Sequence, residues 1–408
     1  MQFQRILEQK IFKLKKEKAN FLLLGPRQTG KSTLIENILR KDKKKILRFK
    51  FQETKTFEDI SKRPSIIFEA ARAALEEGSL TLFIDEIQLI PSVLNDCQSL
   101  IDEYKNKIQI FITGSSARKL RRMEANLLPG RVIYQKLFPL TLQEIFPNHS
   151  NKILKTLSKL KVEKSSITLE DLLIFGSLPG ILNSSKNLRG ELLTSYVSTY
   201  LQEEIRAEAV TRNLGAFARF LELAAYESGS CPNLSKLSQE VGIPLNTIKN
   251  YYQILDDTLI TFSLPAFLKE GRKRIVSTPR YFFFDLGVRN ACAGLELNPH
   301  ILKTESGKLF EHFVILELVR RIEYYYPRQY KYYYWRTNYG AKVDLVLESQ
   351  NELIPIEIKY TQVPRNDDIS HLKTFMSTYG AKKGYLVGRF DHALKMTPEI
   401  TALPWQEI

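Results

Sequence analysis

The most distinctive hydrophobic pattern of the chain lies near its start. Four consecutive apolar residues at 21–24 are typical of a buried strand, and a glycine-containing turn follows at 25–30. Apolar residues then recur from Leu34 to Leu39 at the spacing of one helix face. The pattern predicts a strand, a short loop and a helix in direct succession.

Further apolar runs predict that this strand and helix belong to a larger α/β domain. Residues 46–51, 80–88 and 108–113 have the pattern of strands, and residues 4–18 and 66–75 that of helices. Strands that alternate with helices predict a parallel sheet, whose ligands bind at the carboxyl ends of the strands.

The middle of the chain, residues 151–230, is expected to be largely helical. It is followed by two helices with a tight turn between them, then two strands that flank a basic segment, an order that predicts a winged helix. The elements are helices at 234–241 and 245–256, strands at 258–264 and 281–284, and the basic wing at 269–274. The winged helix is expected either to contact DNA or to act as a spacer between domains.

The last part of the chain predicts a second sheet. It reads helix, three strands, helix, strand, which is the order of restriction-endonuclease-like cores. The ranges are 306–323, 330–336, 343–348, 353–360, 367–379 and 384–388. The tyrosines between 324 and 339 either pack in this sheet or stack on bases.

Composition narrows the class of protein. A chain of 408 residues is too long for one hydrophobic core. The formal net charge of +15 favours a polyanionic partner, with DNA expected before a membrane surface. The alternative is that the surface lysines only keep the protein in solution.

Cys97, Cys231 and Cys292 are far apart and predict neither disulfides nor a zinc site, which suits a reducing cytoplasm. We expect no export signal or membrane anchor, because no apolar run has the length of a bilayer span.

The turn after the first strand has the residues of a phosphate-binding loop, G-x-x-x-x-G-K-[ST]. Its glycines let successive backbone N–H groups converge on an anion at the amino end of the helix. Lys31 is expected to reach the β- and γ-phosphates of ATP, and Ser32 to ligate Mg²⁺. The expected nucleotide contacts are Gly25, Pro26, Arg27, Gln28, Thr29, Gly30, Lys31, Ser32 and Thr33.

Acidic and hydroxyl residues follow the next two strands. We assign Asp85 to the magnesium ion and Glu86 to the attacking water. Ser115 is placed to sense the γ-phosphate. Arg131 is our choice for an arginine that completes a nucleotide site, in this subunit or in a neighbouring one. Three further arginines, Arg118, Arg121 and Arg122, are expected on a solvated basic face.

A second set of charged residues lies in the last domain. Asp344 and the triplet Glu357-Ile358-Lys359 match an Asp, then Glu-x-Lys pattern on adjacent strands. The two carboxylates are expected to bind Mg²⁺ or Mn²⁺, with Lys359 activating water and Glu311 as an outer ligand. The alternative is a structural ion cluster of Asp344, Glu357 and Lys359.

Together these motifs resemble a family of prokaryotic AAA-type P-loop ATPases with a separate carboxyl-terminal domain. The resemblance rests on residues 25–32, 83–88, 112–116 and 129–131 with 137–142, and on 307–311, 334–336, 343–344 and 355–359. It implies an AAA-type ATP-hydrolysing domain followed by a winged helix and a restriction-endonuclease-like domain of the PD-(D/E)XK type. Gly176-Ser177 stands where the family commonly has Gly-Gly.

The predicted fold class is α/β, with an AAA-type P-loop domain at 1–150, a helical region at 151–230, a winged helix at 231–290 and a restriction-endonuclease-like domain at 291–408. The predicted function is an ATPase that acts on DNA, with metal-dependent cleavage as a further activity. The alternative is a non-nucleolytic, ATP-driven switch that recruits a protein partner. ATP and Mg²⁺ are the expected cofactors, and the partners are DNA and either further copies of the chain or another protein.

Overall fold

The computed structural model describes residues 3–40, 45–115, 128–146, 151–154, 160, 166–201, 213–268 and 278–408. Arg118, Arg121, Arg122 and the basic wing at 269–274 lie outside these ranges. The chain forms two compact units: the amino-terminal unit, residues 4–138 and 257–260, and the carboxyl-terminal unit, residues 1–3, 139–256 and 261–408. The domain boundaries proposed from the sequence stay a prediction.

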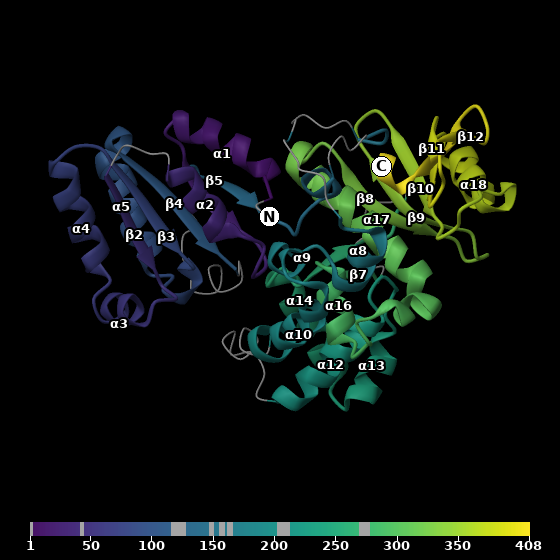
Figure 1. The fold of residues 1–408 in the computed structure, drawn as a ribbon, viewed down its shortest axis with the longest axis horizontal. Coiled ribbons are helices and arrows are strands. Elements are labelled where there is room, and N and C mark those ends of the chain that lie inside the picture. The colour runs from purple at the N-terminus through teal and green to yellow at the C-terminus, as the bar shows by residue number, and fades with distance from the viewer. Residues whose placement is uncertain are drawn as a thin grey trace. The chain divides into compact units, whose positions relative to one another are not determined.

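The amino-terminal unit is a sheet with helices on its faces (Figure 1). Its strands are β1 (Asn20–Leu24), β2 (Lys45–Lys50), β3 (Leu80–Asp85), β4 (Ile108–Gly114) and β5 (Val132–Lys136). Its helices are α1 (Ile6–Lys16), α2 (Lys31–Leu39), α3 (Thr54–Lys62), α4 (Ser65–Glu76) and α5 (Val93–Tyr104), with 3-10 turns η1 (Ile87–Leu89) and η2 (Lys105–Lys107).

Every pairing in this sheet is parallel, and the strand order is β2-β3-β4-β1-β5. Alternate residues of β1 face opposite sides, so that Leu22 and Leu24 join the apolar core formed with α4 and α5. The parallel α/β sheet predicted from the sequence is confirmed. Its carboxyl edge brings together the ends of β1, β3 and β4, where the phosphate loop and the acidic residues lie.

Two helices and one strand of this unit were not predicted: α3, α5 and β5. The β5 strand lies at the edge of the sheet and leaves Ile133 and Tyr134 exposed, so its sequence lacks the continuous burial of a central strand. The predicted strand at 80–88 was too long: it ends at Asp85, because Glu86 has a positive φ of 60° and a 3-10 turn begins at Ile87.

The carboxyl-terminal unit begins with short helices and continues with a helical pair and a hairpin. Its first helices are α7 (Leu142–Ile145), α8 (Leu169–Phe175), α9 (Pro179–Asn183), α10 (Lys186–Ser195), the π-helical η3 (Tyr196–Leu201) and α12 (Leu214–Tyr226). They are followed by α13 (Leu234–Val241), α14 (Leu245–Asp257), β6 (Thr261–Leu264), β7 (Arg280–Phe283), α16 (Leu286–Cys292) and η4 (Pro299–Ile301).

The helices α13 and α14 pair around Gly242, whose φ of 74° suits glycine. Strands β6 and β7 are antiparallel. The first of them starts at Thr261 rather than at residue 258, because α14 continues to Asp257. The element order expected for a winged helix is therefore present. Whether this segment belongs to that fold stays a prediction.

The last elements surround a second sheet. They are α17 (Leu302–Tyr325), β8 (Lys331–Arg336), β9 (Lys342–Glu348), β10 (Leu353–Ile358), η5 (Asn366–Ile369), α18 (Ser370–Tyr379), β11 (Gly384–Gly388), β12 (Leu394–Lys395), β13 (Ile400–Pro404) and η6 (Trp405–Glu407). The strand order is β12-β13-β11-β10-β9-β8. Strands β8, β9 and β10 are antiparallel neighbours, whereas β10 and β11 are parallel. The order of elements agrees with the expectation up to β11, and β12 and β13 were not predicted.

The helix α17 buries charged side chains that bind other segments of this unit. The guanidinium of Arg320 donates to the carbonyl of Leu140 at 3.0 Å and to that of Phe284 at 2.7 Å. The fully buried carboxylate of Asp285 lies close enough to interact electrostatically with it. Burial of a charge is costly unless its partners remain, so this arginine stabilises a specific arrangement of three segments.

Replacement of Arg320 with methionine is therefore expected to lower the free energy of unfolding by about 3–5 kcal/mol, because buried acceptors and Asp285 lose their cationic partner. Urea denaturation followed by circular dichroism measures this change. Arg336→Met, at an exposed position of β8, is the matched control and should change stability by about 0.5 kcal/mol or less. Equal effects of the two substitutions would contradict the role given to Arg320.

Candidate functional site

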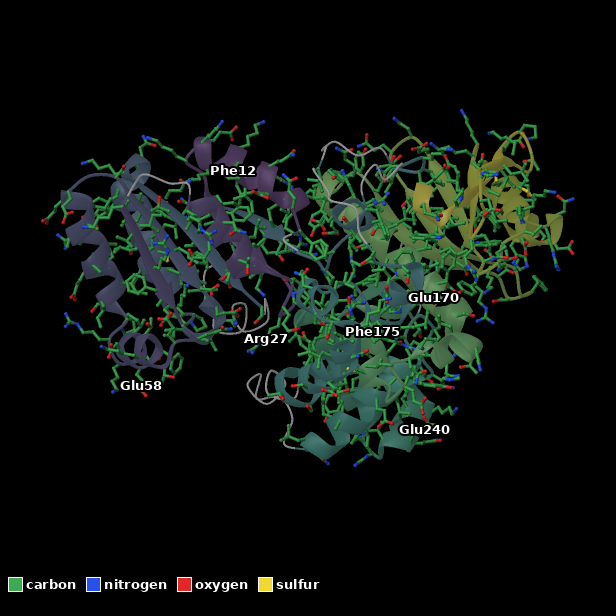
Figure 2. All side chains as sticks on the ribbon, viewed as in Figure 1. Phe12, Arg27, Glu58, Glu170, Phe175 and Glu240 are labelled. Carbon is green, nitrogen blue, oxygen red and sulfur yellow. The ribbon has the colours of Figure 1, made fainter. Side chains whose placement is uncertain are left out.

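The phosphate loop joins β1 to α2 (Figure 2, where Arg27 is labelled). Gly30 ends the loop with a φ of 92°, a conformation that suits glycine, and α2 begins at the next residue. Gly25 is required for a different reason: a Cβ atom there would lie 2.2 Å from the carbonyl oxygen of Leu137. Both glycines of the motif are thus demanded by the backbone of the loop.

Lys31 is buried at the start of α2. Its ammonium donates to the carbonyl oxygens of Gly25 at 2.9 Å and Pro26 at 3.0 Å. It also lies 3.9 Å from a carboxylate oxygen of Glu86. The cation is therefore held over the loop, at the amino end of a helix, where an anion is favoured.

The carboxylate of Asp85 accepts hydrogen bonds from hydroxyl groups on two other elements. Ser32 Oγ donates to its Oδ1 at 2.7 Å, and the hydroxyl of Thr113, on β4, donates to the same oxygen. Burial raises the pKa of Asp85, and the charge of Glu86 adds to this, whereas the two hydroxyl groups oppose it. A serine hydroxyl and a carboxylate oxygen so close together are suitable ligands for Mg²⁺.

Glu86 and Ser115 are connected through Gln88. The amide nitrogen of Gln88 donates to the carboxylate of Glu86 and, at 2.8 Å, to Ser115 Oγ. The amide oxygen of Gln88 accepts from the backbone N–H of Ser115 at 3.1 Å. The structure thus places Glu86 and Ser115 on either side of Gln88, and their roles toward a nucleotide stay a prediction. Gln88 and Thr113 were missed by the sequence reasoning.

Arg5 was also missed, although it contacts the phosphate loop directly. Its guanidinium is buried and donates at 2.6 Å to the carbonyl of Thr29 and at 2.6 Å to that of Phe138. A side chain whose partners are backbone carbonyls leaves no motif in the sequence, because any residue supplies a carbonyl. Arg5 holds the loop against the segment that follows β5.

The remaining predicted contacts differ in exposure. Pro26 and Thr29 are buried, and Thr29 Oγ1 donates to the carbonyl of Pro26 at 2.9 Å. Arg27 is half-buried, whereas Gln28 and Thr33 are exposed. The loop therefore contains both buried and solvent-exposed side chains.

Arg131 lies away from this loop in the same chain. It precedes β5, beside the amino end of β1, and pairs with Asp102 at 2.8 Å. The phosphate loop follows the carboxyl end of β1, at the opposite edge of the sheet. Within one chain the structure does not bring Arg131 to the nucleotide residues, and a role in a neighbouring copy stays a prediction.

The carboxylates predicted for the last domain lie on β9, β10 and α17. Asp344 and Glu357 are both buried, at 2% and 1% exposure. Asp344 Oδ2 accepts the backbone N–H of Ile358 at 3.0 Å, and Lys359 donates to Glu357 Oε1 at 2.5 Å. Burial, followed by the charge of Asp344, raises the pKa of Glu357 to about 8, although Lys359 opposes the shift.

Each acid of this cluster has a cation of its own. Glu311 forms an ion pair with Arg280, the first residue of β7. Asp344 lies 3.7 Å from the ammonium of Lys342, and Glu357 is paired with Lys359. In the part of the chain that the structure describes, no three His, Cys, Asp or Glu side chains are grouped so as to hold a metal ion. The assignment of Glu311, Asp344 and Glu357 to a metal stays a prediction.

Comparison with known proteins supports the assignment of the amino-terminal region as an AAA domain. Residues 17–146 match the family model of an AAA domain. Residues 166–298 and 306–408 match two family models described as domains of unknown function. The AAA match and the parallel sheet support the predicted P-loop ATPase domain. The winged-helix and restriction-endonuclease-like assignments stay predictions.

Similar proteins occur in bacteria and archaea. An uncharacterised protein of Mycobacterium tuberculosis is 24% identical over 395 residues, which cover 95% of this chain and 80% of that protein. One from Methanocaldococcus jannaschii is 24% identical over 358 residues, covering 85% and 76%. The solved structure of a Walker-type ATPase of Pyrococcus abyssi has 15% identity and a TM-score of 0.47, and the likeness covers 71% of this chain and 96% of that one. Among the described residues, no helix has the length and apolar character needed to cross a bilayer.

The contacts of Arg5 generate a prediction about nucleotide binding. Arg5→Ala removes two buried hydrogen bonds that hold the phosphate loop, so ATP affinity should fall about tenfold or more, measured by titration calorimetry. Lys13→Ala, at an exposed position on α1, the helix that follows Arg5, should leave the affinity unchanged. Unchanged affinity in the folded Arg5→Ala variant would show that the loop does not depend on this arginine.

Proposed function

We propose that the protein is an ATP-hydrolysing AAA-type ATPase whose carboxyl-terminal unit acts on DNA. The ATPase part is supported by one grouping above all: Lys31, the Ser32–Asp85 pair and Glu86 meet at the carboxyl edge of the sheet, beside the phosphate loop. This edge is where ligands of parallel α/β sheets bind.

Lys31 has the central role in binding. Its ammonium exchanges the carbonyls of Gly25 and Pro26 for the β- and γ-phosphate oxygens of ATP, and the amino end of α2 favours the same negative charge. Arg5 and Leu137 limit the movement of the loop, because they contact Thr29 and Gly25. The loop is thus prepared for an anion before ATP arrives.

Ser32 and Asp85 would hold the magnesium ion, since their oxygens already lie 2.7 Å apart. When bound, Mg²⁺ neutralises charge on the phosphate groups during transfer. Thr113 orients Asp85 from β4.

Glu86 is the group that we assign to the attacking water. Its carboxylate is held between Lys31 and Gln88, and its backbone N–H donates to Thr113 Oγ1 at 3.2 Å. A carboxylate at this place can accept a proton as water attacks the γ-phosphate. Ser115, connected through Gln88, is placed to respond to that phosphate.

Substitution separates binding from hydrolysis. Lys31→Ala should abolish both ATP binding and turnover, because the loop loses its cation. Glu86→Gln should keep nucleotide binding but lower ATP turnover by about 100-fold or more, since the amide cannot accept the proton. Phosphate release and nucleotide titration measure the two effects. Glu58→Gln, at an exposed position of α3, is the control, and full turnover in Glu86→Gln would refute the assignment of the base.

DNA cleavage is the second candidate function, and one observation favours it. Glu357 Oε2 is buried and has no hydrogen-bond partner within the described ranges, although Asp344 lies on the adjacent strand. A buried carboxylate oxygen without a donor is suited to a cation. Asp344 and Glu357 would hold Mg²⁺ or Mn²⁺, which polarises a phosphodiester, and Lys359 would orient water.

The positive charge of the chain and the exposed residues of α14 support DNA as the substrate. Asn246, Lys249 and Asn250 are exposed on this helix, as a groove-contacting face requires. The alternative function, a non-nucleolytic switch that recruits a protein partner, requires only the ATPase part. It is favoured if neither DNA cleavage nor salt-dependent DNA binding is found.

With plasmid DNA and Mg²⁺ or Mn²⁺, with and without ATP, we expect cleavage that is lost in Asp344→Ala. The rate should rise between pH 6 and pH 9, because a proton on Glu357, whose pKa is raised to about 8, competes with the metal at lower pH. Gel electrophoresis measures both effects. Asp367→Ala, at an exposed position, is the control, and cleavage retained by Asp344→Ala would mark a contaminating nuclease.

A further inference from the structure

Glu311, the acid of the carboxylate cluster that lies on α17, is already paired with a cation of the chain. Arg280 forms an ion pair with Glu311, and its Nε donates to the carbonyl of Gly229 at 2.6 Å. Its NH1 group lies 3.4 Å from the carbonyl oxygen of Asp344. The guanidinium is therefore held next to the carboxylate cluster by three different segments.

We infer that Arg280 competes with a divalent cation for Glu311, so that the resting site offers only Asp344 and Glu357. This inference rests on the proposed metal site. It accounts for the observation that no group of three metal-binding side chains is found among the described residues, although three acids converge on this region.

The other two acids of the cluster, Asp344 and Glu357, are paired with more exposed cations. Lys342 lies 3.7 Å from Asp344 with half of its side chain exposed, and the side chain of Lys359 is about one third exposed. Only 13% of the Arg280 side chain is exposed, and its charge-assisted bonds reach Glu311 and Gly229 together. A cation from solution displaces an exposed lysine more readily than a buried, multiply bonded arginine.

There is space beside the ion pair into which the arginine can move. Arg280 and Glu311 both line a cavity of about 160 Å³, whose other side chains are those of Tyr226, Glu227, Ser228, Ser230, Phe282 and Lys308. Although most of the lining is apolar, the carboxylate of Glu227 and the hydroxyl groups of Ser228 and Ser230 lie in the same cavity, so a guanidinium that leaves Glu311 can keep polar partners.

The inference predicts a non-additive effect on Mn²⁺ binding, measured by electron paramagnetic resonance on the full chain. Arg280→Gln should bind Mn²⁺ about tenfold more tightly than the wild type, because Glu311 becomes available. Glu311→Gln alone should leave the affinity unchanged, and Arg280→Gln with Glu311→Gln should return it to the wild-type value. Arg280→Lys keeps a cation at this position and is the matched control, with affinity close to the wild type.

Three outcomes would overturn the inference. The first is an Arg280→Gln variant that binds Mn²⁺ no more tightly than the wild type. The second is a tenfold loss of affinity in Glu311→Gln, which needs no change at Arg280 and so remains informative if Arg280→Gln does not fold. The third is a double variant as tight as Arg280→Gln.

The proposed metal site fails in a distinguishable way. In that case no variant, Arg280→Gln included, binds Mn²⁺ at millimolar concentration, or binding is unaffected by Asp344→Ala. If Asp344→Ala abolishes wild-type binding while Arg280→Gln changes nothing, the metal site stands and the competition by Arg280 is refuted.

Discussion

The carboxyl-terminal unit depends on the buried charges of a single helix, α17. Glu305 pairs with Arg289 at 3.1 Å, Glu317 accepts the backbone N–H of Leu142 at 3.0 Å, and Arg320 reaches two carbonyls of other segments. Since an unpaired buried charge costs several kcal/mol, these partners must be present together. This explains why residues 166–298 and 306–408, which match separate family models, lie within one compact unit.

The grouping of polar residues around the phosphate loop was predictable from sequence, because these residues are contiguous or follow strand ends. Parallel strands place their carboxyl ends on one edge, so Asp85, Glu86 and Ser115 were expected near the phosphate loop. Thr113 and Gln88 could have been predicted as well, since each is a polar residue two positions from a predicted member of the site. Arg5 carried none, because its partners are the backbone carbonyls of Thr29 and Phe138.

The carboxylate cluster was predictable only in part. Alternation along β10 explains why Glu357 and Lys359 share a face. The ion pair of Glu311 could not be read from the sequence, because Arg280 precedes it by 31 residues and lies on β7, whereas Glu311 lies on α17. The β5 strand was missed for another reason: an edge strand with exposed Ile133 and Tyr134 does not show the apolar run of its neighbours.

The cations of the two proposed sites have different partners. In the amino-terminal unit, the ammonium of Lys31 is bonded to the neutral carbonyls of Gly25 and Pro26, and it lies 3.9 Å from the carboxylate of Glu86. In the function proposed above, this ammonium would exchange the two carbonyls for phosphate oxygens. In the carboxyl-terminal unit, Glu311 and Glu357 are bonded directly to Arg280 and Lys359. At the metal site proposed above, a metal ion would have to replace such a pair, and its affinity would be reduced by the strength of the ion pair that it displaces.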